Sequence, residues 1–385
     1  MNATATLLDR PKAAVPARKP QLPALTGVRT LLAVNIMLFH FTPSHMGPLY
    51  PLINNSFVFV GFFILLSGFV LTYNYGDRPN LVKRDFWLAR FARLYPIYLL
   101  SLVLFWNMLS IEYHARPAGQ FWAGVVLTPL LMQGWSPMLA TFWNTVAWTL
   151  SCEAALYFAF PWIVKLPWPK TTGRLIALLF GVWCIGLIPH ALYMIFNPDH
   201  LPGPANRYSY GLWIRALKYT PVAYICTFLA GVTLAKIQNS LRLTARQRTL
   251  IAALSLLAIG LFFATAVERV PYILLHGGLL VPLFSALVIG LSGRNIFASA
   301  FSVRPLMLLG QASYALFLLH FNFINLLRQY NVAQHLHVAA YDPWISYAAT
   351  LVVSIFAMYF VESPARKFIL RYKTQPQPQP AGREF

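Results

Sequence analysis

The sequence predicts an all-α polytopic membrane protein with about ten transmembrane helices and both termini in the cytosol. Of its 385 residues, 58% are hydrophobic and only 10% are charged, whereas a soluble domain has about 25% charged residues. The apolar residues gather in runs of about 20, which is the length that an α-helix needs to cross a bilayer. The basic residues lie mostly between these runs. Together these three observations exclude an ordinary soluble domain.

Ten apolar runs are long enough to span a membrane. In order along the chain they lie at 29–46, 55–75, 91–111, 145–165, 174–196, 212–236, 249–266, 271–291, 305–328 and 344–366. An eleventh apolar stretch, 118–133, is shorter and contains Gly124 and Pro129. Such a stretch is either part of a long outer segment or a re-entrant piece buried against protein.

The positions of Lys and Arg favour the count of ten. With ten spans and the N-terminus inside, 24 of the 30 basic residues lie on the cytosolic side and 6 lie outside. Counting 118–133 as a further span would invert every later loop and break the positive-inside rule. The net charge of +20 is therefore explained by topology and by contact with membrane lipids. It indicates no nucleic-acid partner.

The chain divides into one membrane domain and two tails. Residues 1–22 are basic and rich in Ala and Pro but lack the apolar core of a signal peptide, so they are interpreted as a disordered cytosolic tail. Residues 23–370 form the membrane domain. Residues 371–385 include a Gln-Pro repeat and are interpreted as a second disordered cytosolic tail. No His, Cys or acidic residues have the spacing of metal ligands, so no metal is expected.

The first apolar run carries Arg29 and His40, with Asn35 between them. Eleven positions on a helix bring the second side chain to within about 20° of the first, ~16 Å further along. Ionisable groups in a span are costly and usually face a bundle interior. One interpretation is a membrane anchor and a hydrogen-bonded interior histidine. The other interpretation is that the two side chains line a polar path through the bundle. This path ends at His40, which would act as a general base or an acyl acceptor.

Three arginines, Arg84, Arg90 and Arg93, flank the start of the third span. They are either basic anchors or ligands for a phosphate group, since side chains at i and i+3 on a helix can clamp one anion together. An inner position suits an anionic cofactor from the cytosol.

Polar residues also lie inside two later spans. Glu153 lies at a depth similar to that of His40, so the two are expected to meet, with the carboxylate orienting the imidazole. The alternative is that Glu153 pairs with a buried arginine or hydroxyl. Ser313 and His320 are seven residues apart and share a helix face, with Tyr314 beside them. They are either substrate-supporting residues or helix-packing contacts.

These motifs together resemble the acyltransferase type 3 family of integral-membrane O-acyltransferases, over about residues 22–368. The motifs are Leu25-Thr-Gly-Val-Arg29 with His40, Phe63-Ile-Leu-Leu-Ser-Gly-Phe69, Arg90-Phe-Ala-Arg-Leu-Tyr-Pro96, Trp148-Thr-Leu-Ser-Cys-Glu153, Ser313-Tyr314 with His320, and Glu362-Ser-Pro364. The resemblance implies a ten-helix core that passes an acyl group, usually acetyl, from cytosolic acyl-CoA to a hydroxyl, commonly on a cell-envelope glycan. It also implies functional roles for Arg29, His40, Arg90 and Arg93.

We therefore expect an O-acyltransferase of the bacterial cytoplasmic membrane. Acyl-CoA, most simply acetyl-CoA, would dock on the arginines Arg29, Arg84, Arg90 and Arg93. His40, oriented by Glu153, would deprotonate a hydroxyl of a glycan or glycolipid, or carry the acyl group itself.

Several alternatives remain open at the level of the sequence. A transporter or flippase for a lipid-linked glycan would also contain buried charges. The acceptor is a glycan or a small secreted metabolite, and the acyl group is acetyl, succinyl or longer. The C-terminal esterase-like domain of some family members has no counterpart in this sequence. The protein is therefore expected to act alone or with a separate extracytoplasmic partner.

Overall fold

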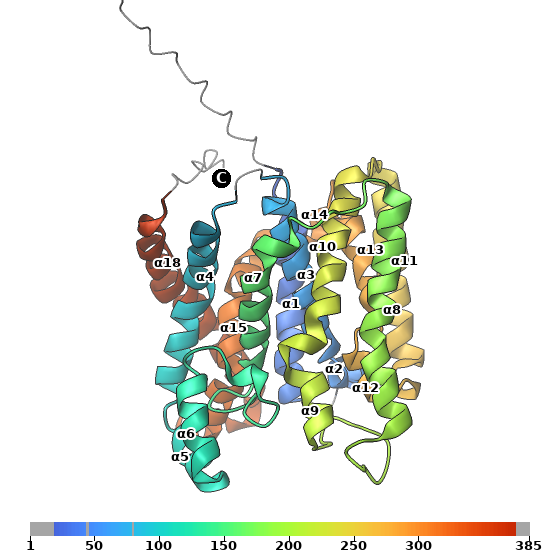
Figure 1. Cartoon of the computed structure of the whole chain (residues 1–385). Helices are drawn as coiled ribbons and strands as arrows, with labels where there is room; N and C mark the ends of the chain where they lie inside the picture. Colours follow the sequence, from blue (N-terminus) through green and yellow to red (C-terminus); the bar gives the residue numbers. More distant parts are fainter. Residues whose placement is uncertain (1–18, 44–45, 79–80, 375–385) are drawn as a thin grey trace, which may run out of the picture.

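The computed structural model describes residues 19–43, 46–78 and 81–374. All regular structure in these ranges is helical, and the long helices stand side by side in a bundle (Figure 1). The long helices are α1 (Pro23–His40), α3 (Val58–Tyr75), α4 (Lys83–Leu104), α7 (Trp148–Ile163), α8 (Thr172–Phe196), α10 (Ile225–Ser240), α11 (Ala245–Thr265), α13 (Val281–Leu291), α15 (Arg304–Gln329) and α17 (Trp344–Ala357). The short helices are α2 (Tyr50–Asn54), α5 (Met108–Ala115), α6 (Ala118–Leu127), α9 (Leu212–Tyr219), α12 (Tyr272–His276), α14 (Ile296–Phe301), α16 (Val332–His335) and α18 (Ser363–Ile369).

The predicted polytopic membrane architecture is confirmed. Within the described ranges, nine helical segments are long and apolar enough to cross a membrane. The remaining predicted span corresponds to α7, which has 16 residues and a length of ~24 Å, less than the ~30 Å of a hydrocarbon core. The predicted boundaries shift by several residues. The first span begins at Pro23, not at residue 29, and the sixth begins at Pro221, not at residue 212.

Both ends of the described chain lie at the same end of the bundle. The Lys19 ammonium pairs with Asp77 at 2.6 Å, and the Thr374 amide donates to Asp85 at 3.0 Å. These two aspartates flank the connection between α3 and α4. The predicted tails fall mostly on residues 1–18 and 375–385, which lie outside the described residues. Their inner portions, 19–22 and 371–374, are described, and both portions contact the bundle.

The long segment before α7 is partly helical and partly irregular. Helices α5 and α6 lie at the end of the bundle opposite α18 (Figure 1). Residues 128–147 then follow a mostly irregular path, and buried amide groups of this segment are paired inside the protein. The amide nitrogen of the fully buried Gln133 donates to the Ala147 carbonyl at 3.2 Å, and that of Asn144 donates to the Leu318 carbonyl at 3.1 Å. The irregular piece, which is buried in part, is therefore 128–147, and residues 118–127 form α6.

Two glycines bring α3 and α10 into close contact. A Cβ atom on Gly68 would lie 2.3 Å from the Phe228 carbonyl oxygen, and one on Gly231 would lie 2.1 Å from the Leu65 carbonyl oxygen. Small residues allow helix backbones to approach closely in membrane proteins, where packing drives association. Because of this contact, the face of α3 that carries Ser67 is held toward the centre of the bundle.

Candidate active site

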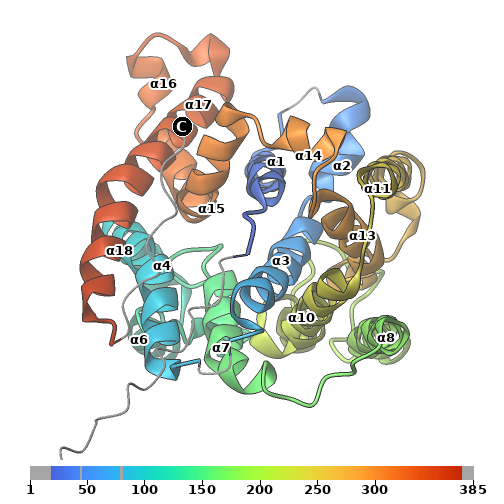
Figure 2. The ribbon, with the colours of Figure 1, turned by 90° about the horizontal axis from the view of Figure 1, so that it is seen from above.

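A cavity of about 350 Å³ lies at the centre of the bundle. Helices α1, α3, α4, α7 and α15 contribute its walls, and they surround this centre when the bundle is viewed from above (Figure 2). Residues 19–22, from the end of the bundle where the described chain begins, also line it. The polar side chains in its wall include Lys19, Arg29, Ser67, Arg90, Arg93, Glu153, Tyr157, Ser313 and Tyr314. The cavity thus contains an excess of positive charge.

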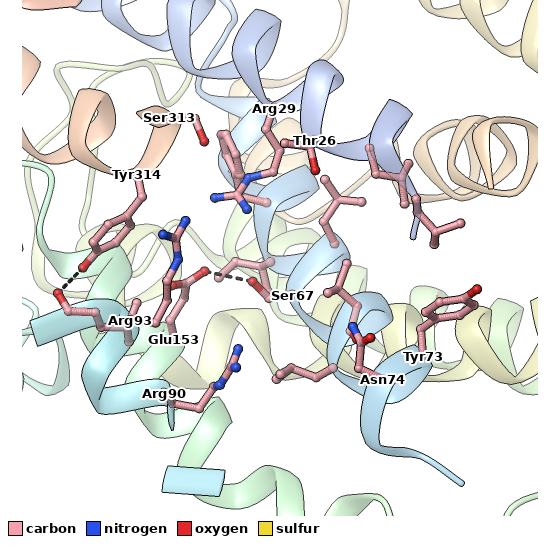
Figure 3. A pocket seen from close by; sticks show the side chains of 18 of the residues that line it. Thr26, Arg29, Ser67, Tyr73, Asn74, Arg90, Arg93, Glu153, Ser313 and Tyr314 are labelled. Carbon is pink, nitrogen blue, oxygen red and sulfur yellow. Dashed lines mark hydrogen bonds between the residues drawn. The ribbon is translucent and has the colours of Figure 1, made fainter. Parts of the chain in front are cut away.

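Arg29 and Arg90 have unused hydrogen-bonding capacity in this cavity. The Nε atom of each is buried and lacks a hydrogen-bond partner among the described residues. The Arg29 guanidinium lies 5.8 Å from the Phe63 ring, and Arg90 Nη2 donates to the Tyr75 hydroxyl at 3.5 Å. A buried donor without a partner is destabilising. Both side chains point into the cavity (Figure 3), where an anionic ligand would satisfy them.

Arg93 differs from Arg90 because it already has a carboxylate partner. Its guanidinium forms an ion pair with Glu362, whose side chain is almost fully buried, and lies 5.3 Å from the Tyr314 ring. Glu362 ends the π-helical turn Met358–Glu362 that follows α17. Arg90 and Arg93 both line the cavity, but Arg93 is already paired with a carboxylate. The clamp of both arginines on one phosphate therefore stays a prediction.

Two other predicted residues lie away from the cavity wall. Arg84 is exposed in the first turn of α4. The Asn35 amide donates to the Leu31 carbonyl of its own helix at 2.8 Å. Neither residue lines the central cavity. Asn35 is 600° around the helix from Arg29, so it lies on a different face from Arg29 and His40.

Glu153 lies in the cavity and not beside His40. Its Oε1 atom accepts a hydrogen bond of 2.9 Å from the Ser67 hydroxyl (Figure 3), and the Tyr157 hydroxyl lies 3.2 Å from Ser67 Oγ. The expected His40–Glu153 contact is therefore wrong, because similar depth in two spans did not place the side chains on facing sides. The alternative that Glu153 pairs with a buried hydroxyl is the one observed.

His40 instead meets His320 from α15. The His40 Nδ1 atom lies 2.9 Å from the Ile36 carbonyl oxygen and 3.2 Å from His320 Nε2. His320 Nδ1 lies 2.8 Å from the Phe317 carbonyl oxygen. A carbonyl oxygen only accepts, so these partners assign the hydrogen to Nδ1 in both neutral rings. His40 Nδ1–H then donates to Ile36 and His320, and His40 Nε2 keeps its lone pair.

Two aromatic rings separate the cavity from this histidine pair. Phe63 and Phe317 both line the cavity, with ring centroids 6.3 Å apart. The Phe317 ring lies 6.0 Å from the His320 ring, and the His320 ring lies 5.0 Å from the His40 ring. His40 is thus one layer of side chains beyond the cavity.

Ser313 and Tyr314 line the cavity and also hold the helices around it. The Ser313 hydroxyl donates to the Gly310 carbonyl at 2.8 Å, and the Tyr314 hydroxyl donates to the Leu94 carbonyl on α4. No role is predicted from the sequence for Ser67, which lies in the motif that runs from Phe63 to Phe69, or for Tyr157. The position of Tyr157 one helical turn after Glu153 was the available signal.

The chain belongs to the acyltransferase 3 family. Residues 22–362 match the family whose description is acyltransferase domain. The protein is therefore a membrane-bound acyltransferase with many membrane-spanning helices, and the sequence-based recognition and enzyme class are confirmed.

Several bacterial proteins are similar to this chain. Acyltransferase MdmB of Streptomyces mycarofaciens is 27% identical over 328 residues, which cover 81% of each chain. Peptidoglycan O-acetyltransferase OatA of Listeria monocytogenes is 23% identical over 373 residues, covering 90% of this chain and 56% of OatA. O-acetyltransferase OatA of Staphylococcus aureus is 22% identical, covering 90% of this chain and 57% of OatA. The chain thus spans a little over half the length of the OatA proteins. No solved structure matches it.

Proposed function

We propose that this protein transfers an acetyl group from cytosolic acetyl-CoA to a hydroxyl of an extracytoplasmic glycan or glycolipid, in the bacterial cytoplasmic membrane. One observation carries this proposal: the guanidinium Nε atoms of Arg29 and Arg90 have no hydrogen-bond partner among the described residues, and both side chains line the cavity that residues 19–22 also line. The acetyl group and the hydroxyl acceptor are supported by the names of the OatA relatives.

The negative charge of acyl-CoA, the proposed donor, matches the positive charge of the cavity wall. The phosphates of acyl-CoA are anionic, and planar guanidinium groups bind phosphate through charge-assisted hydrogen bonds. Within the part of the chain that the structure describes, Arg29 and Arg90 each have an Nε donor without a partner, whereas Arg93 is neutralised by Glu362. The end of the bundle that holds both described chain ends is the cytosolic end in the predicted topology, so the donor enters from the cytosol.

The acyl group must then reach His40. The narrow pantetheine arm would pass Phe63 and Phe317, which requires these rings to move aside. His40 Nε2, with its lone pair free, accepts the proton of the acceptor hydroxyl while the hydroxyl oxygen attacks the thioester carbonyl. The new C–O bond forms, the C–S bond breaks, and the proton passes to the CoA sulfur. In the alternative route, Nε2 carries the acyl group between two such steps.

The test is transfer of radiolabelled acetyl from acetyl-CoA to the envelope fraction of the source bacterium by purified protein. We expect His40→Ala to lose transfer by a factor of about 10² or more, the usual contribution of a general base, while acetyl-CoA binding persists. Full transfer by folded His40→Ala would overturn the assignment of His40. Label recovered in a small soluble product would keep the enzyme and change the acceptor class.

A further inference from the structure

A second, larger cavity opens at the end of the bundle opposite the described chain ends. Its volume is about 1040 Å³, and three segments line it: residues 50–57, 193–208 and 267–275. These segments include α2, the connection from α8 to α9, and α12, which lie toward the lower end in Figure 1. In the predicted topology this end faces away from the cytosol.

The wall of this cavity suits a ligand with hydroxyl groups. The Asn55 amide, 8% exposed, donates to Glu268 Oε1 at 3.1 Å. The Tyr50, Tyr208 and Tyr272 rings provide flat apolar surfaces beside these polar groups. Concave sites that combine aromatic faces with a few fixed donors and acceptors are typical of small-molecule binding. Carboxylate oxygens accept hydroxyl protons, and amide groups both donate and accept.

One residue of this wall, Arg207, reaches the backbone beside His40. Its Nη2 atom donates to the Phe39 carbonyl at 3.3 Å, and its Nη1 atom donates to Asn54 Oδ1 at 3.4 Å. The guanidinium also lies 4.0 Å from the Phe39 ring centroid. His40 therefore lies between the two cavities, with Phe317 and His320 on the donor side and Phe39 and Arg207 on the other.

The surroundings of Arg207 are positively charged. Arg207 forms no ion pair with any carboxylate among the described residues. The buried Lys218 ammonium donates to the Arg207 carbonyl at 3.2 Å, and Arg269 also lines the cavity. Two basic residues, Arg207 and Arg269, line the cavity against one carboxylate in its described wall, Glu268, although only six basic residues are predicted on the outer side. This excess of positive charge is unusual for an outer surface under the positive-inside rule.

We propose that the outer cavity is the acceptor site and that its ligand is a hydroxylated molecule carrying an anionic group, which Arg207 binds while a hydroxyl reaches His40. This inference rests on the proposed function. It adds the chemical class of the acceptor and a residue that recognises it. An arginine binds carboxylate and phosphate through the same charge-assisted hydrogen bonds, so either anion fits.

The test uses a single cysteine placed in the cavity. Gly203 lines the cavity, and a Cβ atom there meets nothing within 4 Å. Gly119 on α6 has the same open surroundings but lies outside the cavity, so Gly119→Cys is a matched control. The rate of alkylation by an uncharged maleimide would be measured with D-glucuronate or D-glucose present. These two probes differ by one carboxylate. Alkylation of the wild-type protein measures the background reaction of its own cysteines, Cys152, Cys184 and Cys226.

We expect glucuronate to slow alkylation of Gly203→Cys about threefold or more, and glucose to have less effect. Adding Arg207→Gln should remove the difference between the probes, and Arg207→Lys should keep part of it. Equal effects of the two probes, no effect of either, or an equal slowing of Gly119→Cys would overturn the proposal. Titration with acetyl-CoA tests the donor cavity separately, so failure here is distinguishable from failure of the proposed function.

Discussion

At the scale of single residues, the candidate site residues form two separate sets. Glu153, Ser67 and Arg29 belong to the inner cavity, whereas His40 and His320 form a pair beyond it. A neutral histidine that accepts a hydrogen bond from Nδ1–H of another histidine fixes the tautomer and orientation of the donating ring. His320 is therefore a positioning residue for His40 in this account.

The first prediction compares two substitutions of His320. Gln retains an amide oxygen that can accept from His40 Nδ1–H, whereas Leu fills the space without an acceptor. We expect His320→Leu to lower kcat about 10–100-fold and His320→Gln to lose less, with the Kd for acetyl-CoA unchanged in both. Equal losses in the two variants would mean that His320 acts only by packing. Turnover and titration with acetyl-CoA would provide the two readouts.

The second prediction concerns Glu153, the one carboxylate in the described wall of the donor cavity. Glu153→Gln keeps the hydrogen bond with Ser67 but removes a negative charge near the expected phosphates. We expect the variant to bind acetyl-CoA more tightly than the wild type, by a factor of about three or more at low ionic strength. This gain in affinity should shrink as salt is added. Unchanged or weaker binding by the folded variant would contradict the placement of a phosphate group near this carboxylate.

At the scale of elements, the site depends on helices that pack with almost no space between their backbones. Gly68 on α3 contacts α10, whereas Gly61 on the same helix has nothing within 4 Å of an added Cβ atom. The π-helical turn after α17 has a similar positioning role, because it brings Glu362 to Arg93. Such turns often occur at functional sites.

The third prediction uses the two glycines of α3 as a matched pair. Gly68→Ala would place a methyl group against the Phe228 carbonyl and should destabilise the protein by about 1–3 kcal/mol, the usual effect of overpacking. Gly61→Ala should be neutral or slightly stabilising, since Ala favours the helix by up to about 1 kcal/mol. Thermal unfolding of both variants in the same detergent measures the difference. Equal midpoints would show that α3 and α10 pack less tightly than described.

At the scale of the whole molecule, the sequence was sufficient for the architecture. Apolar runs of span length and the positions of Lys and Arg predicted ten spans, because bilayer thickness and loop charge are constraints on composition. Nine of the ten correspond to helical segments of span length in the described ranges, and the tenth corresponds to the shorter α7. Arg29, Arg90 and Glu153 were predicted as site residues, and all three line the cavity.

The sequence was not sufficient for the contacts between helices. Depth within a span follows from residue number, but which helices face each other does not, so His40 was assigned to Glu153 although it meets His320. The Arg93–Glu362 pair joins residues 269 positions apart, and no local pattern predicts it. The irregular path of 128–147 could not be predicted from the sequence either, since its buried polar groups are paired mostly through tertiary contacts.

Isothermal titration of purified protein with acetyl-CoA would show whether the inner cavity binds acyl-CoA. We predict that wild-type protein binds and that Arg90→Ala weakens binding about tenfold or more, equivalent to ~1.4 kcal/mol. Arg84→Ala, on the same helix but outside the cavity, should bind as wild type does. Folded wild-type protein that does not bind acetyl-CoA, or equal losses in the two variants, would contradict the account.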